Sequence, residues 1–362
     1  MRKKGFIIVL SAFMMIMAFW LQGCSLDNTA YDEEPVKDSE SIAGSLITVG
    51  FSQVGSESDW RMANTKSVQE AFTVDKGYAL IFNDGQQKQE NQIKAIREFI
   101  DQDVDYILLD PCVEKGWDSA LREAKEAGIP VIVYDRMVDV SDTDLYDAWI
   151  GSDFYLEGKK ACTWLTEYLE SIEYDGDINI VDLQGTLGAS AQIGRTKALN
   201  DAVSKNGKWH LIAQETGDFT TAKGKEIMEA MLIKNGGNIN VVYCENDNMA
   251  YGAIEAIRAA GYKIGTNLKN NEILILSFDA SNEGLRLTMD GVIAVNTECS
   301  PLYGDMLVEM IEALGDGEKL EKNTYIEEEQ FSNFKGIGSL RIDGNSYFVN
   351  EVDEELLENR EY

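Results

Sequence analysis

The chain contains a single histidine, His210, and its five cysteines form no Cys-x-x-Cys pair. A Ser-His-Asp triad would need that histidine, and no Gly-x-Ser-x-Gly motif is present, so a serine hydrolase of this type is disfavoured. His210 has no motif around it and is expected at a surface or half-buried position. Singly scattered cysteines argue against a zinc site and a disulfide scaffold. We expect no metal, no cofactor and buried free thiols at four positions, which are Cys112, Cys162, Cys244 and Cys299.

Basic residues are also scarce, with 32 Lys and Arg against 63 Asp and Glu, which gives a net charge of −31. So acidic a body repels nucleic acid, and a DNA- or RNA-binding role is therefore disfavoured. A Gly-rich turn at residues 185–190 lacks the P-loop lysine and the dinucleotide spacing. The sequence has no internal repeat with a period of about 20–50 residues. It also has no long Pro/Gly/Ser linker, so any domains must be joined through strand-like segments.

One long uncharged apolar run is present, at residues 6–21, and three basic residues at positions 2–4 precede it. A basic start, an apolar core and a small residue before the cut are typical of a secretory signal peptide. Cys24 follows Gly23 directly, which predicts a bacterial lipoprotein signal (residues 1–24) with lipidation of Cys24. Gln22 departs from the small residue usual at its position. An uncleaved anchor is the alternative, although the run is short of the about 20 residues of a spanning helix.

Residues 25–45 carry six acids and one lysine with almost no apolar periodicity. This composition predicts a solvated acidic tether between the membrane and a folded body. The remaining chain, from residue 46 to 362, is too long for one ordinary core and suggests two domains.

Apolar runs rich in β-formers alternate with amphipathic segments along this body; Ile93, Ile96 and Ile100, for example, share one helical face. Repeated strand–helix alternation predicts an α/β fold with parallel sheets covered by helices on both faces. Alternating apolar positions around Asp343-Gly344 predict a hairpin, and the last residues a surface helix. The predicted strands are 46–51, 78–82, 106–109, 131–134, 178–183, 241–244, 273–278 and 292–297.

The opening strand leads into a loop that carries acids, Trp60 and Arg61 directly before a helical pattern. In open α/β sheets, ligands bind beyond the carboxyl ends of strands, where such loops lie. An acid, a flat ring and a planar cation suit a small polyhydroxylated ligand, because the ring stacks and the ions bond hydroxyls. The alternative is an ordinary strand-to-helix turn with a buried tryptophan.

Other predicted strands also end in polar residues. Asp135 and Arg136 follow one strand, Arg195 lies on a helix after another, and Asn246 and Asp279 follow two more. A single acid at a strand end is usually a helix cap. Acids, amides and arginines at five strand ends predict a polar cleft on one side of the sheets.

Four motifs closely resemble the galactofuranose-binding members of the ribose/galactose class of periplasmic binding proteins of bacterial ABC sugar importers. They lie at residues 49–61, 84–93, 183–190 and 217–220, within a likeness that runs from about Leu46 to Asp316. The resemblance implies a type I periplasmic binding protein, with two similar Rossmann-like lobes joined by a three-strand hinge. It also implies that the lobes close on a sugar.

The resemblance further implies ten sugar contacts, matched motif by motif. They are Glu57, Ser58, Asp59, Trp60, Arg61, Asp135, Arg136, Arg195, Asn246 and Asp279. Three departures from the family pattern stand out. Asp59 replaces an expected glycine, Glu245 replaces an expected histidine, and the tail after Glu327 is longer.

The predicted domains are an N-terminal lobe of residues 46–149 plus 280–297 and a C-terminal lobe of 150–279 plus 298–362. The predicted function is an extracellular, lipid-anchored and monomeric binding protein, not an enzyme. It would deliver a monosaccharide of the galactofuranose type to the permease of an ABC importer, from the outer face of the cytoplasmic membrane or in the periplasm. The alternative is a sugar-sensing subunit for a membrane histidine kinase or chemoreceptor. A sugar-modifying enzyme would need a catalytic pair.

Overall fold

The computed structural model describes residues 46–362. The predicted signal peptide, the lipidated Cys24 and the acidic tether therefore lie outside the described residues. Among the described helices, none has both the length and the apolar composition to cross a membrane.

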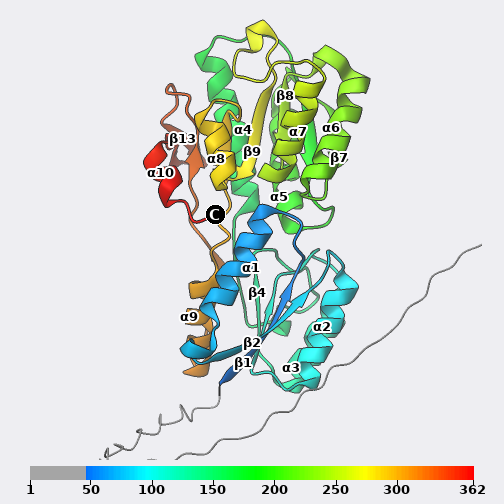
Figure 1. The fold of residues 1–362 in the computed structure, drawn as a ribbon, viewed down its shortest axis with the longest axis vertical. Coiled ribbons are helices and arrows are strands. Elements are labelled where there is room, and N and C mark those ends of the chain that lie inside the picture. Colours follow the sequence, from blue (N-terminus) through cyan, green and yellow to red (C-terminus); the bar gives the residue numbers. More distant parts are fainter. Residues whose placement is uncertain (1–45) are drawn as a thin grey trace, which may run out of the picture. The chain divides into compact units, whose positions relative to one another are not determined.

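The first lobe is built on a six-stranded sheet in the order β11-β5-β4-β3-β1-β2, in which every pairing is parallel. Its central strands are buried apolar runs, as parallel strands covered on both faces must be. The helices α1 and α9 pack on each other, as do α2 and α3 (Figure 1). The elements are β1 (Ile47–Gln53), α1 (Asp59–Ala71), β2 (Tyr78–Asp84), α2 (Gln89–Asp101), β3 (Tyr106–Leu109), α3 (Asp118–Ala127), β4 (Val131–Tyr134), β5 (Ala148–Gly151), α9 (Gly304–Gly315) and β11 (Asn323–Tyr325).

The second lobe repeats this plan with the order β12-β10-β9-β8-β6-β7. Its pairings are parallel except for the short β12, which runs antiparallel to β10. The predicted α/β fold of two parallel-sheet lobes is confirmed. The elements are α4 (Phe154–Ser171), β6 (Ile178–Gln184), α5 (Ser190–Lys205), β7 (Trp209–Thr216), α6 (Thr221–Asn235), β8 (Val241–Cys244), α7 (Asp247–Ala259), β9 (Leu274–Asp279), α8 (Asn282–Met289), β10 (Val295–Glu298) and β12 (Gln330–Phe331).

Three short segments join the lobes: residues 152–153 after β5, 299–303 after β10 and 326–329 after β11. The predicted lobe boundaries are wrong in the last part of the chain. Residues 280–297 are predicted in the first lobe, but β10 pairs with β9 in the second sheet. Residues 298–362 are predicted in the second lobe, but they include α9 and β11 of the first lobe. The chain returns to the first lobe one element later, because α9 packs on α1 and β11 pairs with β5.

The chain ends in a predicted hairpin and a predicted helix, both of which are present. β13 (Ser339–Ile342) pairs antiparallel with β14 (Asn345–Phe348) across Asp343-Gly344. Helix α10 (Glu354–Asn359) follows and lies against α8 (Figure 1).

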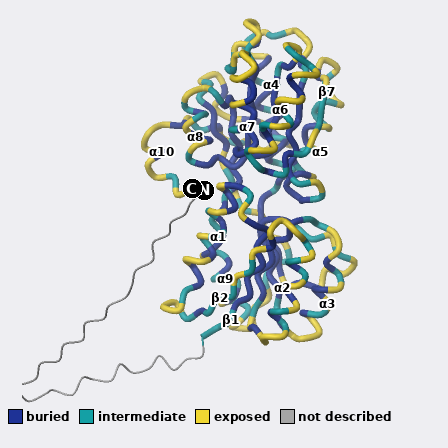
Figure 2. Tube along the Cα trace, turned by 45° about the vertical axis from the view of Figure 1, so that its right-hand side comes forward, coloured by how far each residue is buried: buried dark blue, intermediate teal, exposed yellow. Residues whose placement is uncertain are grey.

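The inner strands of both sheets are buried, while the edge strands β2, β7 and β11 and the outer helices and loops carry exposed residues (Figure 2). Cys112, Cys162, Cys244 and Cys299 are buried and free, as predicted.

Candidate functional site

A small cavity lies between the lobes, beyond the carboxyl ends of β1, β4, β8 and β9. It is lined by nine of the ten predicted residues, and the missing one is Asp59. It is also lined by four that the sequence did not point to. The lining residues are Glu57, Ser58, Trp60, Arg61, Asp135, Arg136, Phe154, Ala191, Arg195, Phe219, Asn246, Asp279 and Cys299.

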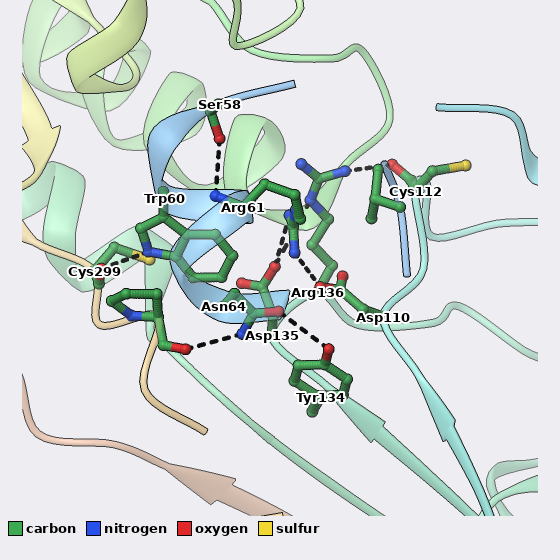
Figure 3. A network of polar contacts seen from close by, with 12 residues as sticks. Ser58, Trp60, Arg61, Asn64, Asp110, Cys112, Tyr134, Asp135, Arg136 and Cys299 are labelled. Carbon is green, nitrogen blue, oxygen red and sulfur yellow. Dashed lines mark hydrogen bonds and ion pairs between the residues drawn. The ribbon is translucent and has the colours of Figure 1, made fainter. Parts of the chain in front are cut away.

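The first turn of α1 presents Trp60 and Arg61 to this cavity. Ser58 caps the helix, because its hydroxyl accepts a hydrogen bond from the backbone N–H of Arg61 at 3.1 Å. The Trp60 ring is buried, and its Nε1 donates to the carbonyl of Cys299 at 2.6 Å (Figure 3). Cys299 belongs to a segment that joins the lobes. The aromatic wall of the cavity is therefore held directly against the hinge.

Arg61 is the hub of the first-lobe side of the site (Figure 3). Its guanidinium lies 3.1 Å from Glu57 Oε1 and 3.1 Å from Asp135 Oδ2, and it also donates to Asp110. Only 2% of the Arg61 side chain is exposed, so these acids replace the water it would otherwise bind. Asp110 was not among the residues predicted from the sequence. It directly follows β3, so an acid at a strand end could have identified it.

Arg136 reaches from the first lobe towards the second. Its Nη1 donates to the Cys112 carbonyl at 3.1 Å, and its Nη2 lies 3.5 Å from Glu57 Oε1. The guanidinium also lies over the Phe219 ring, 5.2 Å from its centroid. Because Phe219 belongs to the second lobe, this contact bridges the cleft.

Arg195 on α5 is the corresponding cation of the second lobe. Its Nε donates to Glu157 Oε2 at 2.7 Å and its Nη1 to the Glu245 carbonyl at 2.5 Å, while its Nη2 lies 3.9 Å from Asp279 Oδ1. The guanidinium also packs over Phe278. Both lobes thus present a buried, acid-paired arginine to the cavity.

Two acids of the lining stand at strand ends, and both have a backbone conformation that few residues other than glycine adopt. Asp135 has a φ of 55° and Asp279 a φ of 100°. Such residues persist only where the surroundings hold them, and they cluster at functional sites. Burial raises the pKa of the Asp279 carboxyl well above its usual value, against the opposing effect of Arg195. Asn246 caps α7, because its Oδ1 accepts a hydrogen bond from the Met249 N–H at 2.9 Å. Its Nδ2 donates to the Phe219 carbonyl at 3.1 Å.

The structure places Asp59 outside the cavity, where it bridges the lobes instead. Its backbone N–H donates to Asn248 Oδ1, and Asn248 Nδ2 donates to its carboxylate, both at 3.1 Å. Glu245 lies behind the cavity wall, where its carboxylate accepts from Gly185 N–H at 2.7 Å and from the Thr196 hydroxyl at 2.5 Å. The expected histidine is thus replaced by an acid that supports the wall.

Two buried polar atoms at the cavity have no hydrogen-bond partner within residues 46–362. They are Glu57 Oε2, from the first lobe, and Arg195 Nη2, from the second. An unsatisfied buried polar atom costs about 1–3 kcal/mol, so such atoms need an explanation. One acceptor and one donor on opposite walls suit a neutral ligand with hydroxyl groups, which can bond both.

Glu157, Cys299 and Glu328 form a further cluster behind Arg195, with ligand atoms within 4.8 Å of one another. The protein's own donors engage both acids. Glu157 accepts from Arg195, and Glu328 Oε1 accepts from the Ser152 hydroxyl at 2.7 Å. Burial raises the pKa of both carboxyls. Donors of the protein itself therefore already occupy part of this cluster.

The chain is similar to known proteins in both sequence and structure. Residues 49–319 match the family described as periplasmic binding protein domain. The galactofuranose-binding protein YtfQ of Escherichia coli (strain K12) is 45% identical over 258 residues, which cover 70% of this chain and 78% of that protein.

Two solved structures are similar over most of their length. A protein of Mycobacterium smegmatis in complex with β-D-fucofuranose is 43% identical with a TM-score of 0.74, covering 79% of this chain and 91% of that one. The binding component of the arabinose ABC transporter of Shewanella sp. ANA-3, bound to α- and β-L-arabinofuranose, is 41% identical with a TM-score of 0.72. That match covers 78% of this chain and 91% of the other.

Proposed function

The chain belongs to the periplasmic binding protein family, and from this premise we propose that it binds a monosaccharide in the furanose form between its lobes. The sugar is galactofuranose or a close relative, and the protein delivers it to an ABC importer. It is a binding protein and not an enzyme, in keeping with a family whose members bind substrates.

The observation that carries this proposal is the pair of unpartnered atoms on opposite walls, Glu57 Oε2 and Arg195 Nη2. A sugar hydroxyl can donate to the first while another hydroxyl accepts from the second, so one ligand satisfies both lobes. The energetics agree. A Kd of about 1 μM corresponds to about −8 kcal/mol. Hydrogen bonds to charged groups contribute about 1.5–3 kcal/mol each, so a few such contacts suffice.

The charge of the site favours a neutral ligand. Arg61 and Arg195 are already paired with buried acids, and Asp135 and Asp279 line the cavity as well. Arg136, the third arginine of the lining, lies 3.5 Å from Glu57, so an anionic ligand such as a sugar phosphate would meet acids beside every arginine of the cavity. The furanose form is proposed because the three similar proteins are named for, or were solved with, furanose sugars.

The test is calorimetry of residues 46–362 against D-galactose, D-fucose, L-arabinose and D-ribose, with myo-inositol as a non-furanose control. Saturable binding of the first three is expected. The anomeric resonance of bound ¹³C-galactose should report the furanose ring. A bound pyranose would overturn the ring assignment, and no binding to any sugar would overturn the function.

The family implies a periplasmic or extracellular location. The finer proposal is that Cys24 is lipidated and tethers the protein to the outer face of the cytoplasmic membrane, where a permease subunit receives the sugar as partner. In support, Cys24 follows a basic and apolar leader. Two acyl chains hold a protein at a membrane where a single chain is marginal.

The anchor is tested by expressing wild type and Cys24→Ala in a Gram-positive host and fractionating the cells. Wild type should be found in the membrane fraction with a lipid-sized mass increase on the N-terminal peptide. Cys24→Ala should lose that mass and leave the membrane fraction. An unmodified, intact N-terminus in the mature wild type would contradict the anchor and leave the sugar site unaffected.

The importer role is favoured over the sensor alternative because a protein 41% identical to this chain is named as a component of an ABC transporter. A gene for a permease beside the gene for this chain would support the importer role, and a lone kinase gene would support the sensor.

A further inference from the structure

The C-terminal segment, residues 349–362, lies beyond the family match, which ends at residue 319, and it contacts the turn that follows the cavity acid Asp279. Its helix α10 lies against α8 (Figure 1). A small apolar cluster fixes the segment to the second lobe, and Ala280, the residue after the cavity acid Asp279, belongs to this cluster. The cluster consists of Ala280, Leu285, Phe331, Val352 and Leu357.

Hydrogen bonds tie the segment to the turn that carries Asp279. Arg360 Nε donates to the Ala280 carbonyl at 2.9 Å, and the Asn282 N–H donates to the Tyr362 carbonyl at 2.7 Å. The side chain of Asn282 donates to the Leu357 carbonyl at 2.8 Å. Asp279 and Ala280 both have positive φ, at 100° and 53°. Without external bonds, a turn of two such residues would relax towards commoner conformations.

The same segment also holds two of the three connections between the lobes. Glu298 is the last residue of β10. Its Oε1 lies 2.8 Å from Arg360 Nη1 and accepts a hydrogen bond from the Tyr362 hydroxyl at 2.9 Å. Its other oxygen accepts from the Glu329 N–H at 2.8 Å. Glu329 lies in the connection 326–329, and Glu298 directly precedes the connection 299–303. Arg360 thus contacts both the turn of Asp279 and the hinge.

We propose that Arg360 and Tyr362 are positioning residues of the sugar site, which hold the Asp279 turn in its left-handed conformation and brace the hinge at Glu298. This rests on the proposed function for its ligand. Neither residue lines the cavity. They act through Asp279, whose carboxyl does.

The test compares Arg360→Gln with Arg341→Gln, which removes the same charge from an exposed position on the C-terminal hairpin. Arg360→Gln should weaken sugar binding about tenfold, since it removes bonds to charged and backbone groups. Arg341→Gln should stay within about twofold, as surface changes do. Tyr362→Phe removes only the hydroxyl, which donates to Glu298 and accepts from Arg360 Nη2, and should cost about threefold. It also serves as the test variant if Arg360→Gln does not fold.

A double-mutant cycle separates positioning from general destabilisation. In an Asp279→Asn background, Arg360→Gln should cost less than about threefold, because residues that act on the same contact are not additive. An unchanged affinity of Arg360→Gln, or an equal loss in both backgrounds, would overturn the proposal.

A ligand-free measurement keeps this result distinct from a failure of the proposed function. Hydrogen exchange of the Asn282 amide, which is bonded to Tyr362, should accelerate in Arg360→Gln and not in Arg341→Gln. If wild type binds no sugar, the proposed function is wrong, but hydrogen exchange of Asn282 still tests whether Arg360 holds the Asp279 turn. Unchanged protection of Asn282 would reject the brace in either case.

Discussion

At the scale of single residues, Arg136 has an unusual place in the site. It is anchored in the first lobe by the Cys112 carbonyl and Glu57, yet it faces the ring of Phe219 in the second. Only 3% of Arg136 is exposed, so its removal leaves a hole and takes away one of the two arginines that contact Glu57.

We therefore expect Arg136→Ala to weaken sugar binding by at least about tenfold with the fold intact, since buried charge partners cost about 1.5–3 kcal/mol each. Titration calorimetry with circular dichroism measures both. The control is His210→Ala. That side chain is 46% exposed, lies 3.3 Å from Asp177 and is not part of the cavity lining, so affinity should not change. Unchanged affinity in Arg136→Ala would reject the cleft as the binding site.

Asp182 on β6 makes stability depend on pH. It is fully buried, and burial raises the pKa of its carboxyl to about 7, against a lowering by Gln214. Between pH 4 and pH 7 the unfolded chain releases this proton and the folded chain keeps it. The folded state therefore loses stability as pH rises through this window, by a total on the order of 3 kcal/mol.

Asp182→Asn has no such proton, so its stability relative to wild type should increase from pH 4 to pH 7. Urea unfolding at several pH values measures the difference. Asp290→Asn, which changes an exposed acid of the same lobe, is the control for removing one carboxyl group. A constant difference for Asp182→Asn would show that its carboxyl titrates normally.

The sequence predicted charged site residues better than apolar ones. Asp135, Arg136 and Asp279 stand at strand ends, where a polar residue after an apolar run is conspicuous. Phe154 and Phe219 gave no such signal, because an aromatic residue near a helix start is equally suited to a core. Their position at the cavity depends on how the two lobes meet, which no local pattern encodes.

At the scale of elements, β3, β4 and β8 have the predicted bounds because each is a short apolar run between breakers. β10 begins at Val295, three residues later than predicted. The apolar residues 292 and 293 instead belong to the turn after helix α8, where the N–H of Ile293 donates to the Leu287 carbonyl. β11 was not predicted, since its three residues are exposed and carry no apolar pattern. Without β11, nothing in the sequence indicated that the chain returns to the first sheet after β10.

The packing of α9 on α1 depends on Gly304. A β-carbon there would lie 2.2 Å from the Ser67 carbonyl oxygen and 2.8 Å from Ala71 Cβ. We expect Gly304→Ala to destabilise the protein by about 1–3 kcal/mol, as overpacking does.

The matched control lies on the same helix. A β-carbon at Gly315 has its nearest contact at 3.5 Å, so Gly315→Ala should be neutral or stabilise by up to about 1 kcal/mol through helix propensity. Urea unfolding monitored by tryptophan fluorescence distinguishes the two variants. Equal effects would mean that α1 moves freely to accommodate the added methyl group.

At the scale of the whole molecule, Asp59 and Asn248 connect the lobes by two hydrogen bonds outside the cavity. These bonds stabilise the state in which the two lobes are in contact, although neither residue lines the cavity. Asn248→Ala should therefore weaken sugar binding about tenfold by favouring separation of the lobes.

Small-angle scattering should show a smaller radius of gyration when sugar is added to wild type, and a larger ligand-free radius for Asn248→Ala. Thr221→Ala is the control, because it removes the 3.3 Å contact of Asn248 within its own lobe and leaves both bonds to Asp59. A radius that does not change with sugar would indicate a preformed, rigid site.

The return of the chain through α9 and β11 also determines when the first lobe can fold. Asn323 pairs with Trp149, a partner about 170 residues earlier in the chain, and α9 packs on a helix that begins at Asp59. Contacts so distant in sequence form slowly, because a long loop must close first. While the chain is being synthesised, its first lobe lacks an edge strand and a covering helix until the last fifth of the sequence has emerged. For a protein of a periplasmic or extracellular family, we expect this late completion to delay folding of the first lobe while the chain is exported.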